Sequence, residues 1–327
     1  MIRLKPRRCP VILFVAAAVF AGCGGSQPPI GAPGTMSLSL PEHTIAPTHD
    51  RSAPLLYVTN TTADYNDVKI YRANARDPGP IGVITDSIQF PIADCIDSDG
   101  TLYVTNLGTG RGFVSEYAAG KTKLSKIITK GLNEPVYCAI DSAGNLWVTN
   151  LGDSSVTKYK KGSMKPSMTI TDGVLDPHGI AFDPSGDMYV SNVLSSSEGN
   201  VVVYAPGHKS PSRTITDGVG SAGGVAVDAK GILYVANYGQ CNVEEYLSGK
   251  DHPYQKITDE INGPTGPTVG KNGWLYVTNT GYQSCNRDYS WNLILEFPPG
   301  SLTPSGKEVS KGVYSPGGSA YDPPLLP

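Results

Sequence analysis

The residues of this sequence that could do chemistry are few and scattered, and His178 stands out among them. It lies in the tripeptide Pro177-His178-Gly179, at the start of a short apolar segment. An imidazole in a cleft can act as a general base or as a metal ligand. A catalytic metal takes about three protein ligands, and no acidic residue accompanies His178 at this position of the sequence. We therefore prefer a histidine that bonds a backbone carbonyl, and keep the catalytic interpretation as the alternative.

Asp94 and Tyr137 lie in other short apolar segments of the same kind and are candidate ligand-binding residues. A buried carboxylate requires a partner, so Asp94 either faces a ligand or bonds a neighbouring backbone amide. The sequence leaves both interpretations open. At the position of Asp94, the other segments have Cys138, Ile180, Val225, Pro267 and Ser319.

A longer loop, residues 280–292 (TGYQSCNRDYSWN), supplies the candidates Tyr282, Arg287 and Trp291. Aromatic side chains together with arginine on a loop are typical of surfaces that recognise a protein or a glycan. The alternative is a loop that only covers its own part of the fold. We list these three residues as ligand-binding candidates.

Four cysteines of the body of the chain form two possible pairs. Cys241 (in Gly-Gln-Cys-Asn) and Cys285 (in Gln-Ser-Cys-Asn) occupy equivalent loops, and outside the cytoplasm such a pair favours a disulfide. Cys95 and Cys138 lie on neighbouring equivalent segments but one position out of register. Because alternate residues of a strand point in opposite directions, we expect these two to be buried thiols.

The elements that must position these residues come from one unit repeated six times. A tetrapeptide of the form Tyr-Val-Thr-Asn recurs at intervals of 46, 44, 42, 45 and 42 residues. An Ile-Thr pair steps along the chain in the same register, which makes a chance pattern improbable. The tetrapeptides are residues 57–60, 103–106, 147–150, 189–192, 234–237 and 276–279.

Each unit predicts four short strands, separated by an Asp-x-x-Gly turn and by glycine after an aromatic residue. Four strands in about 44 residues, six times over, predict an all-β, six-bladed β-propeller. The first unit begins at Leu55 with its second strand, and residues 316–322 supply a first strand without a second. The C-terminal strand is therefore expected to join the first blade and close the ring, which removes an open sheet edge.

The asparagine that ends each tetrapeptide gives six asparagines at one repeated position. They could form a polar ring for sugars. Asparagine at a strand end more often bonds its own turn, and its occurrence in every unit favours that structural interpretation. The six are Asn60, Asn106, Asn150, Asn192, Asn237 and Asn279.

The N-terminus carries an export signal, predicted over residues 1–22. Basic residues precede an apolar run over 11–21, which is too short to span a bilayer. The sequence Phe20-Ala21-Gly22-Cys23 resembles the bacterial lipobox, which implies cleavage before Cys23, loss of Cys9 with the signal, and lipidation of Cys23. An ordinary secretory signal is the alternative.

The remainder divides into a tether and the propeller. Residues 23–53 are rich in Gly, Ser and Pro without periodicity, as in a flexible linker. Residues 54–327 form the propeller domain. We expect contact with a membrane only through the lipid anchor, in the bacterial cell envelope, facing the periplasm or the cell surface.

Composition excludes several classes of protein. Glycine (38) and proline (27) are abundant and charged residues are only 17%, which argues against helical bundles and coiled coils. The formal net charge is −3, but residues 1–22 carry four cations and no acid, so the remainder has 22 basic against 29 acidic residues, a net charge of −7. A mildly acidic body without basic tracts makes nucleic acid an improbable partner. We expect a monomer.

The repeat Pro-x-Gly-Ile-Ala-x-Asp-x-x-Gly-x-Leu-Tyr-Val-x-Asn resembles the NHL-repeat and SMP-30/gluconolactonase-like six-bladed propellers, including bacterial lipoproteins, over residues 55–322. This resemblance implies the fold more than an activity. Streptogramin-lyase-like members use a Pro-His-Gly entry with a nearby Glu, and Pro177-His178-Gly179 is similar to its first half. Gluconolactonase-like members bind a divalent ion in the channel, but this sequence shows no clear counterpart of their ligand set.

The sequence therefore predicts a lipid-anchored, extracytoplasmic propeller that binds a protein, a peptide or an envelope carbohydrate, with no cofactor. The alternative is a metal-dependent lactonase-like hydrolase or a streptogramin-lyase-like enzyme, with His178 as the base and a divalent metal ion at the mouth of the channel.

Overall fold

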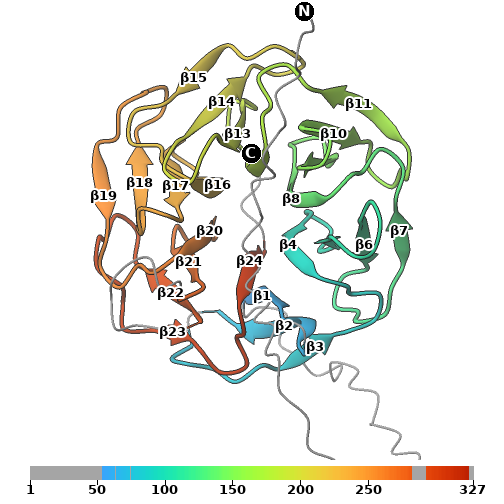
Figure 1. Ribbon diagram of the computed structural model, residues 1–327. Helices are drawn as coiled ribbons and strands as arrows, with labels where there is room; N and C mark the ends of the chain where they lie inside the picture. Colours follow the sequence, from blue (N-terminus) through green and yellow to red (C-terminus); the bar gives the residue numbers. More distant parts are fainter. Residues whose placement is uncertain (1–53, 63, 74, 282–291, 324–327) are drawn as a thin grey trace, which may run out of the picture.

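The computed structural model describes residues 54–62, 64–73, 75–281 and 292–323. Their strands form six four-stranded antiparallel sheets, arranged as blades around a central axis (Figure 1). The prediction of an all-β, six-bladed β-propeller is confirmed. The predicted signal peptide, the tether and Cys23 lie outside the described residues.

Each blade consists of one inner strand at the axis, two intermediate strands and one outer strand. The inner strands are β24 (Pro316–Asp322), β4 (Pro91–Ile96), β8 (Pro135–Ile140), β12 (Pro177–Phe182), β16 (Ala222–Val227) and β20 (Pro264–Val269) of blades 1 to 6. The second strands, in the same order, are β1 (Leu55–Thr61), β5 (Leu102–Asn106), β9 (Leu146–Asn150), β13 (Met188–Val193), β17 (Leu233–Asn237) and β21 (Leu275–Asn279).

The third and outer strands complete the blades. The third strands are β2 (Asn66–Arg72), β6 (Phe113–Tyr117), β10 (Ser155–Tyr159), β14 (Gly199–Tyr204), β18 (Asn242–Tyr246) and β22 (Leu293–Phe297). The outer strands are β3 (Gly82–Ile84), β7 (Lys126–Ile128), β11 (Pro166–Ile170), β15 (Arg213–Ile215), β19 (Gln255–Ile257) and β23 (Glu308–Val309).

The ring closes as predicted, because the C-terminal β24 pairs antiparallel with β1 in blade 1 (Figure 1). Leu55 lies opposite Asp322, and Asn60 lies opposite Pro316 at the other end of the pair. The described chain therefore enters and leaves the propeller on one face. We call it the turn face, because the Asp-x-x-Gly turns also lie there. The opposite face, with the loops into the inner strands and the loops after the second strands, is the loop face.

The apolar core lies between the blades. Among the described residues, six clusters of buried side chains each combine two neighbouring blades. Between blades 4 and 5, for example, Val203 and Ile215 pack with Val225, Val235 and Tyr246. Burial of apolar area is the main stabilising contribution in such a ring, so each blade depends on both of its neighbours.

The Asp-x-x-Gly turn has the geometry that its residues predict. In blade 4, one carboxylate oxygen of Asp183 accepts hydrogen bonds from the backbone N–H groups of Ser185 and Asp187, both at 2.9 Å. Gly186 takes a φ of 88°, which L side chains rarely adopt. The turn fixes the hairpin between the inner and second strands, and with it the position of the inner strand along the axis.

Within the described part of the chain, no helix has both the length and the apolar character that a membrane span requires.

Candidate functional site: the central channel and the loop face

The mouth of the channel lies on the loop face and is formed by the second residue of each inner strand. At two of these positions glycine is required by the close approach of neighbouring strands. A Cβ atom on Gly317 would collide with the carbonyl oxygen of Ile92, and one on Gly223 would lie 2.6 Å from that of Thr265. The full set is Ile92, Val136, His178, Gly223, Thr265 and Gly317.

Tyr137 spans the channel just below this mouth. It belongs to β8 of blade 3, and its hydroxyl donates a hydrogen bond to the carbonyl oxygen of Thr265 (2.7 Å) on β20 of the opposite blade. The oxygen of Gly317 lies 3.4 Å away. The ring needs small neighbours, because a Cβ atom on Gly266 would lie 2.9 Å from the hydroxyl. Burial raises the pKa of Tyr137, so it remains a hydrogen-bond donor.

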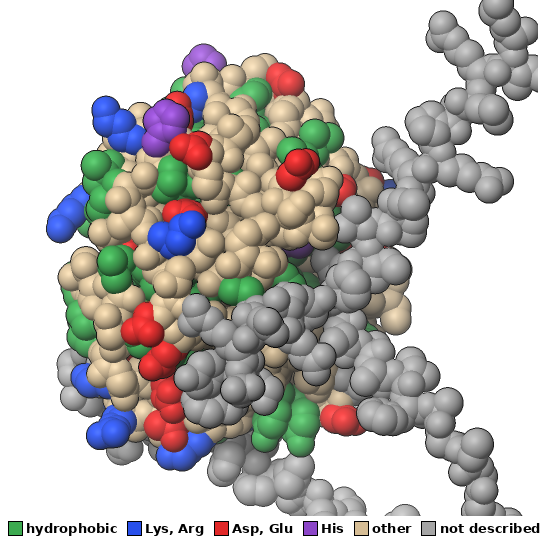
Figure 2. All heavy atoms as spheres, turned by 60° about the vertical axis from the view of Figure 1, so that its left-hand side comes forward, with side chains coloured by type: hydrophobic (Ala, Val, Ile, Leu, Met, Phe, Trp, Pro, Cys, Tyr) green, Lys and Arg blue, Asp and Glu red, His purple; other side chains and the backbone are tan. Residues whose placement is uncertain are grey.

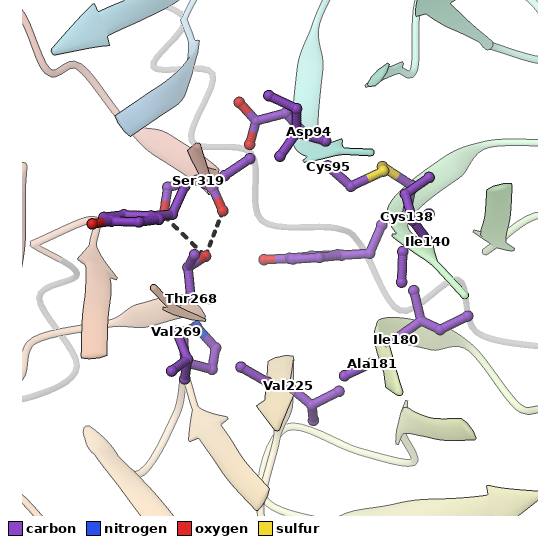
Figure 3. A pocket seen from close by; sticks show the side chains of 18 of the residues that line it. Asp94, Cys95, Cys138, Ile140, Ile180, Ala181, Val225, Thr268, Val269 and Ser319 are labelled. Atoms are coloured by element: carbon purple, nitrogen blue, oxygen red, sulfur yellow. Dashed lines mark hydrogen bonds between the residues drawn. A yellow bond between two sulfur atoms is a disulfide. The ribbon is translucent and has the colours of Figure 1, made fainter. Parts of the chain in front are cut away.

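A cavity of about 150 Å³ lies around the axis beside Tyr137 (Figure 3). Its wall includes the fourth residue of every inner strand, which is the set aligned with Asp94 from the sequence. Most of these side chains are apolar, and the polar exceptions are Asp94 and Ser319. The hydroxyl of Thr268 donates to the carbonyl oxygen of Ser319, which links blades 6 and 1 at this level.

Asp94 lies at the edge of this cavity, on the strand next to that of Ser319 (Figure 3). Its side chain is buried, and neither carboxyl oxygen has a hydrogen-bond partner among the described residues. The predicted alternative of a bond to a neighbouring amide is therefore not seen for these oxygens. Desolvation raises the pKa of Asp94 well above its usual value, and the neutral acid is the form that this site favours.

His178 is half-buried at the mouth of the channel. Its backbone carbonyl accepts a hydrogen bond from the hydroxyl of Thr149 (2.7 Å), which ties blade 4 to blade 3. Desolvation lowers the pKa of the imidazole to about 4, so the ring is neutral at physiological pH. A neutral imidazole can accept a proton or bind a metal, but so low a pKa makes it a weak base.

The repeated asparagines are internal hydrogen-bonding groups, as the structural interpretation predicts. All six are buried. The side-chain amide oxygen of each accepts a hydrogen bond of 2.9–3.3 Å from a backbone N–H group in the loop that enters its own blade. For blades 1 to 6, the donors are the N–H groups of Tyr314, Gln89, Asn133, Leu175, Gly220 and Asn262.

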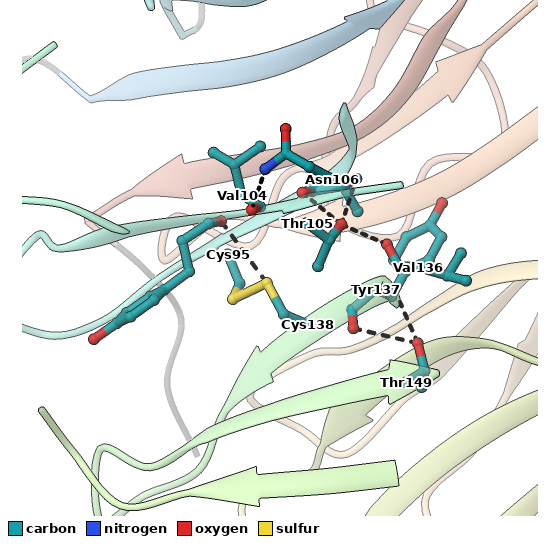
Figure 4. The surroundings of a disulfide bond; sticks show 10 residues. Cys95, Val104, Thr105, Asn106, Val136, Tyr137, Cys138 and Thr149 are labelled. Atoms are coloured by element: carbon teal, nitrogen blue, oxygen red, sulfur yellow. Dashed lines mark hydrogen bonds between the residues drawn. A yellow bond between two sulfur atoms is a disulfide. The ribbon is translucent and has the colours of Figure 1, made fainter. Parts of the chain in front are cut away.

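The prediction that Cys95 and Cys138 are free buried thiols is wrong, because they form a disulfide with their Cα atoms 5.8 Å apart (Figure 4). The prediction took residues one position out of register on the neighbouring first strands β4 and β8 to point in opposite directions. They are inner strands of two different blades, and the side of one blade faces the other. An out-of-register pair can therefore meet across the boundary between blades.

The second predicted disulfide lies partly outside the described residues. Cys241 is disulfide-bonded, while Cys285 lies in the segment that the structure does not describe, so their pairing stays a prediction. The same segment contains the ligand-binding candidates Tyr282, Arg287 and Trp291.

A group of exposed aromatic residues on the loop face was not predicted. Tyr65 follows β1, Phe90 precedes β4 and Tyr314 precedes β24. Their exposed fractions are 44%, 38% and 39%. The rings of Tyr65 and Tyr314 stack with centroids 4.3 Å apart and an angle of 12° between planes. We call these three residues the aromatic cluster.

One sequence signal could have revealed the aromatic cluster. Phe90 directly precedes an inner-strand proline and has a φ of 51°, and the residues at this position in four of the other five blades also have positive φ. A bulky residue is uncommon in that conformation. These four equivalent residues are small or polar: Glu134, Asp176, Gly263 and Ser315.

The described residues contain no group of three or more His, Cys, Asp and Glu side chains that could hold a metal ion. In this part of the chain, Asp94 and His178 do not belong to such a group.

Comparison with known proteins places the chain by its fold. No family model and no curated protein matches the sequence. Among solved structures, a chain of "Crystal structure of Nidogen/Laminin Complex" is similar with a TM-score of 0.64 at 14% identity, over 82% of this chain and 98% of that one. A protein of unknown function from Bacteroides caccae is similar with a TM-score of 0.64 at 10% identity, over the same shares. The class that fold and comparisons define is the six-bladed β-propeller.

Proposed function

We propose that this protein is an exported, membrane-tethered propeller that acts as a binding module for a protein, a peptide or an envelope carbohydrate. The observation that carries the proposal is the position of Tyr137. Its ring spans the channel and its hydroxyl bonds the opposite blade, which leaves little room for a substrate to pass down the axis. Recognition then falls to the loop face, where aromatic side chains are exposed.

The disulfide between Cys95 and Cys138 supports export, because such bonds persist mainly outside the reducing cytoplasm. The lipobox-like sequence at Cys23 supports a lipid anchor in the bacterial envelope. Since the described chain enters the propeller on the turn face, a tether from Cys23 would leave the loop face free to point away from the membrane. That orientation suits a module that binds partners in the periplasm or at the cell surface.

The mildly acidic body of the chain, without basic tracts, supports a partner other than nucleic acid. In the view of Figure 2, acidic side chains gather in a line, while lysines and arginines are scattered. Burial, together with the charges of Asp259 and Glu308, raises the pKa of Glu260. Nucleic-acid binding would need a cluster of cations instead. We propose that the module works as a monomer and without a cofactor.

The fold neighbours are compatible with binding but do not select a ligand. One of them comes from a structure whose title names a complex of two proteins, nidogen and laminin. At 14% identity this likeness concerns the fold alone.

The alternative is a metal-dependent lactonase-like hydrolase or a streptogramin-lyase-like enzyme that uses His178. The observation behind it is the His178 imidazole at the mouth of the channel, although a pKa of about 4 makes this ring a weak base. A divalent ion at Asp94 and the channel asparagines would be required, yet the amide oxygens of those asparagines already accept hydrogen bonds from backbone N–H groups.

A blocking experiment tests the binding proposal. The full chain is purified in detergent with a single new cysteine, either Glu134→Cys on the loop face or Lys121→Cys on the turn face. Both native residues are exposed. Each variant is coupled to a polyethylene glycol maleimide and mixed with solubilised cell envelope.

We expect saturable binding of an envelope component that the label at position 134 abolishes and the label at position 121 preserves. Equal binding by both labelled variants, or none by the unlabelled chain, would contradict the proposal. A stoichiometric divalent ion with lactone turnover that is lost in His178→Ala would establish the enzyme instead.

A further inference from the structure

We propose that the aromatic cluster of Tyr65, Phe90 and Tyr314 is a binding site for the pyranose rings of an uncharged carbohydrate. This inference rests on the proposed function and names its ligand class. The apolar C–H face of a sugar ring packs on an aromatic ring, while its hydroxyl groups bond polar atoms at the edge. The cluster offers both kinds of surface on the loop face.

The blade repeat does not require exposed aromatic side chains at these three positions, and yet all three are exposed. Tyr65 and Tyr314 stack on each other, so each shields one face of its partner, and yet both remain about two-fifths exposed. Phe90 occupies a left-handed position where four other blades have Glu134, Asp176, Gly263 and Ser315. Strained, exposed aromatic residues on a rigid scaffold are characteristic of functional positions.

The scaffold holds the three residues in place before any ligand arrives. The N–H of Tyr314 donates to the Asn60 side chain (2.9 Å), and that of Phe90 donates to the Asn66 side chain (3.0 Å). The N–H of Tyr65 donates to the hydroxyl of Thr62 (2.8 Å). The short segment from the end of β1 to the start of β2 thus anchors the whole cluster. Such preorganisation reduces the entropic cost of binding.

The same hydrogen bonds make a peptide a poorer occupant than a sugar. A bound peptide strand gains affinity by pairing with free backbone groups at a strand edge. In the cluster, the backbone N–H groups of all three aromatic residues are already used, and the carbonyl oxygens of Tyr65 and Phe90 accept bonds from Thr62 and Leu107. Two cavities among the described residues lie elsewhere, around the axis and beside Trp147. The exposed ring faces therefore suit a sugar ring better than a peptide strand.

Polar groups beside the rings suit hydroxyl groups rather than phosphate or carboxylate. Neither phenol hydroxyl, of Tyr65 or Tyr314, is hydrogen-bonded to another described residue, so both can bond a sugar. Asp64, next in sequence to Tyr65, is exposed and can accept further bonds. The cation Lys311, three residues before Tyr314, is paired with Asp77 at 3.1 Å. The charge of the site therefore favours an uncharged glycan.

Binding measurements with defined sugars test the inference. The full chain in detergent is titrated by calorimetry with cellohexaose, maltohexaose and chitohexaose, and with a peptide of residues 26–34 of its own tether as the proline-rich probe. We expect at least one hexasaccharide to bind and the peptide not to bind. Tyr65→Ala and Tyr314→Ala should each weaken the association about tenfold or more, as removal of a central aromatic contact does.

Two matched variants separate binding from folding. Tyr254→Ala removes a tyrosine of similar exposure (43%) outside the cluster and should leave the affinity unchanged. Tyr65→Phe keeps the stacked ring and should retain most of the affinity for the hexasaccharide. Loss of affinity in Tyr254→Ala, or a hexasaccharide affinity that Tyr65→Ala leaves unchanged, would overturn the inference.

The outcomes also separate this inference from the proposed function. If none of the three hexasaccharides binds while an envelope component still binds the loop face, the carbohydrate assignment is wrong and the binding module stands. If the tether peptide binds and Tyr65→Ala abolishes that binding, the cluster is a peptide site. If nothing binds in either experiment, both proposals fail.

Discussion

Two sets of residues on the loop face, the ring of asparagines and the aromatic cluster, differ in every respect that matters for function. The asparagines recur in all six blades, are buried, and bond the loops that enter their own blades. Tyr65, Phe90 and Tyr314 have no repeated pattern, are exposed, and keep their side chains for contacts with solvent or a ligand. In this propeller, repetition therefore marks residues that build the blade.

Departure from the repeat is not sufficient evidence of function. Tyr137 and the disulfide of Cys95 with Cys138 also occur once, yet both make internal bonds that join different blades. Asp94 is a third kind of exception, because it is buried and its carboxyl has no partner among the described residues. The useful criterion combines departure from the repeat with exposure and unused capacity for hydrogen bonding. Four measurements test this distinction, from the largest expected effect to the smallest.

Removal of the inter-blade disulfide should have the largest effect. The bond links residues 43 apart in sequence, and the chain-entropy model predicts a loss of about 4 kcal/mol in the free energy of unfolding. The double variant Cys95→Ser/Cys138→Ser, compared with the wild type by urea denaturation, measures this loss. Ligand binding by the folded variant should persist. A change below about 1 kcal/mol would show that the bond adds little to the contacts between blades 2 and 3.

The second-largest effect on stability is expected from the replacement of one asparagine of the ring. Asn192 is fully buried, accepts a bond from Leu175 and donates to the carbonyl oxygen of Gly173 and to Asn200. Asn192→Ala leaves these groups without partners and should reduce the free energy of unfolding by about 2–4 kcal/mol. The same urea titration checks it. If the variant were as stable as the wild type, the contrast with the aromatic cluster would disappear.

Asp94→Asn should stabilise the protein in a pH-dependent way. Burial raises the pKa of this carboxyl, so above the unfolded value of about 3.9 the folded state holds a proton that the unfolded chain has lost. The free energy of unfolding then falls as pH rises, by up to about 1.4 kcal/mol per pH unit, until Asp94 itself ionises.

An asparagine cannot ionise, so Asp94→Asn should match the wild type near pH 4 and exceed it by about 1–3 kcal/mol at pH 7. Thermal or urea unfolding at several pH values tests the difference. Parallel curves for the two proteins would mean that Asp94 is ionised in the folded state and is paired with a bound ion or water.

The smallest effect on stability is expected in the aromatic cluster itself. Tyr65 is exposed and its stacking partner remains anchored through its backbone, so Tyr65→Ala should change the free energy of unfolding by less than about 1 kcal/mol. The variant should nevertheless lose carbohydrate affinity. A stability loss as large as that of Asn192→Ala would assign the cluster to the scaffold.

Much of the fold could be predicted from local patterns. The spacing of the tetrapeptides gives the number of blades, and the half-units at Leu55 and Pro316 predict the pairing of β1 with β24. The alignment of Asp94 with Ser319 and the other fourth residues of the inner strands also holds, since these residues line one cavity. Repeated short-range signals are reliable here because each blade meets the same packing requirements.

The candidate site was less predictable, because it depends on contacts between distant parts of the chain. Tyr137 bonds Thr265, 128 residues away, and no local pattern indicates that its ring crosses the channel. Tyr65 and Tyr314 are 249 positions apart in the sequence and meet only because the ring closes in blade 1. Their separate positions in the sequence carry no sign of a shared surface.

The sequence by itself therefore determined the class of architecture, the number of blades, the closure and the structural role of the asparagines. These follow from hydrogen-bonding and packing rules that act within one repeat. Tertiary structure alone decided that Cys95 meets Cys138, that Asp94 is buried without a partner, and that Tyr65 stacks on Tyr314. Each of these depends on how neighbouring blades are turned relative to one another, which a single repeat does not specify.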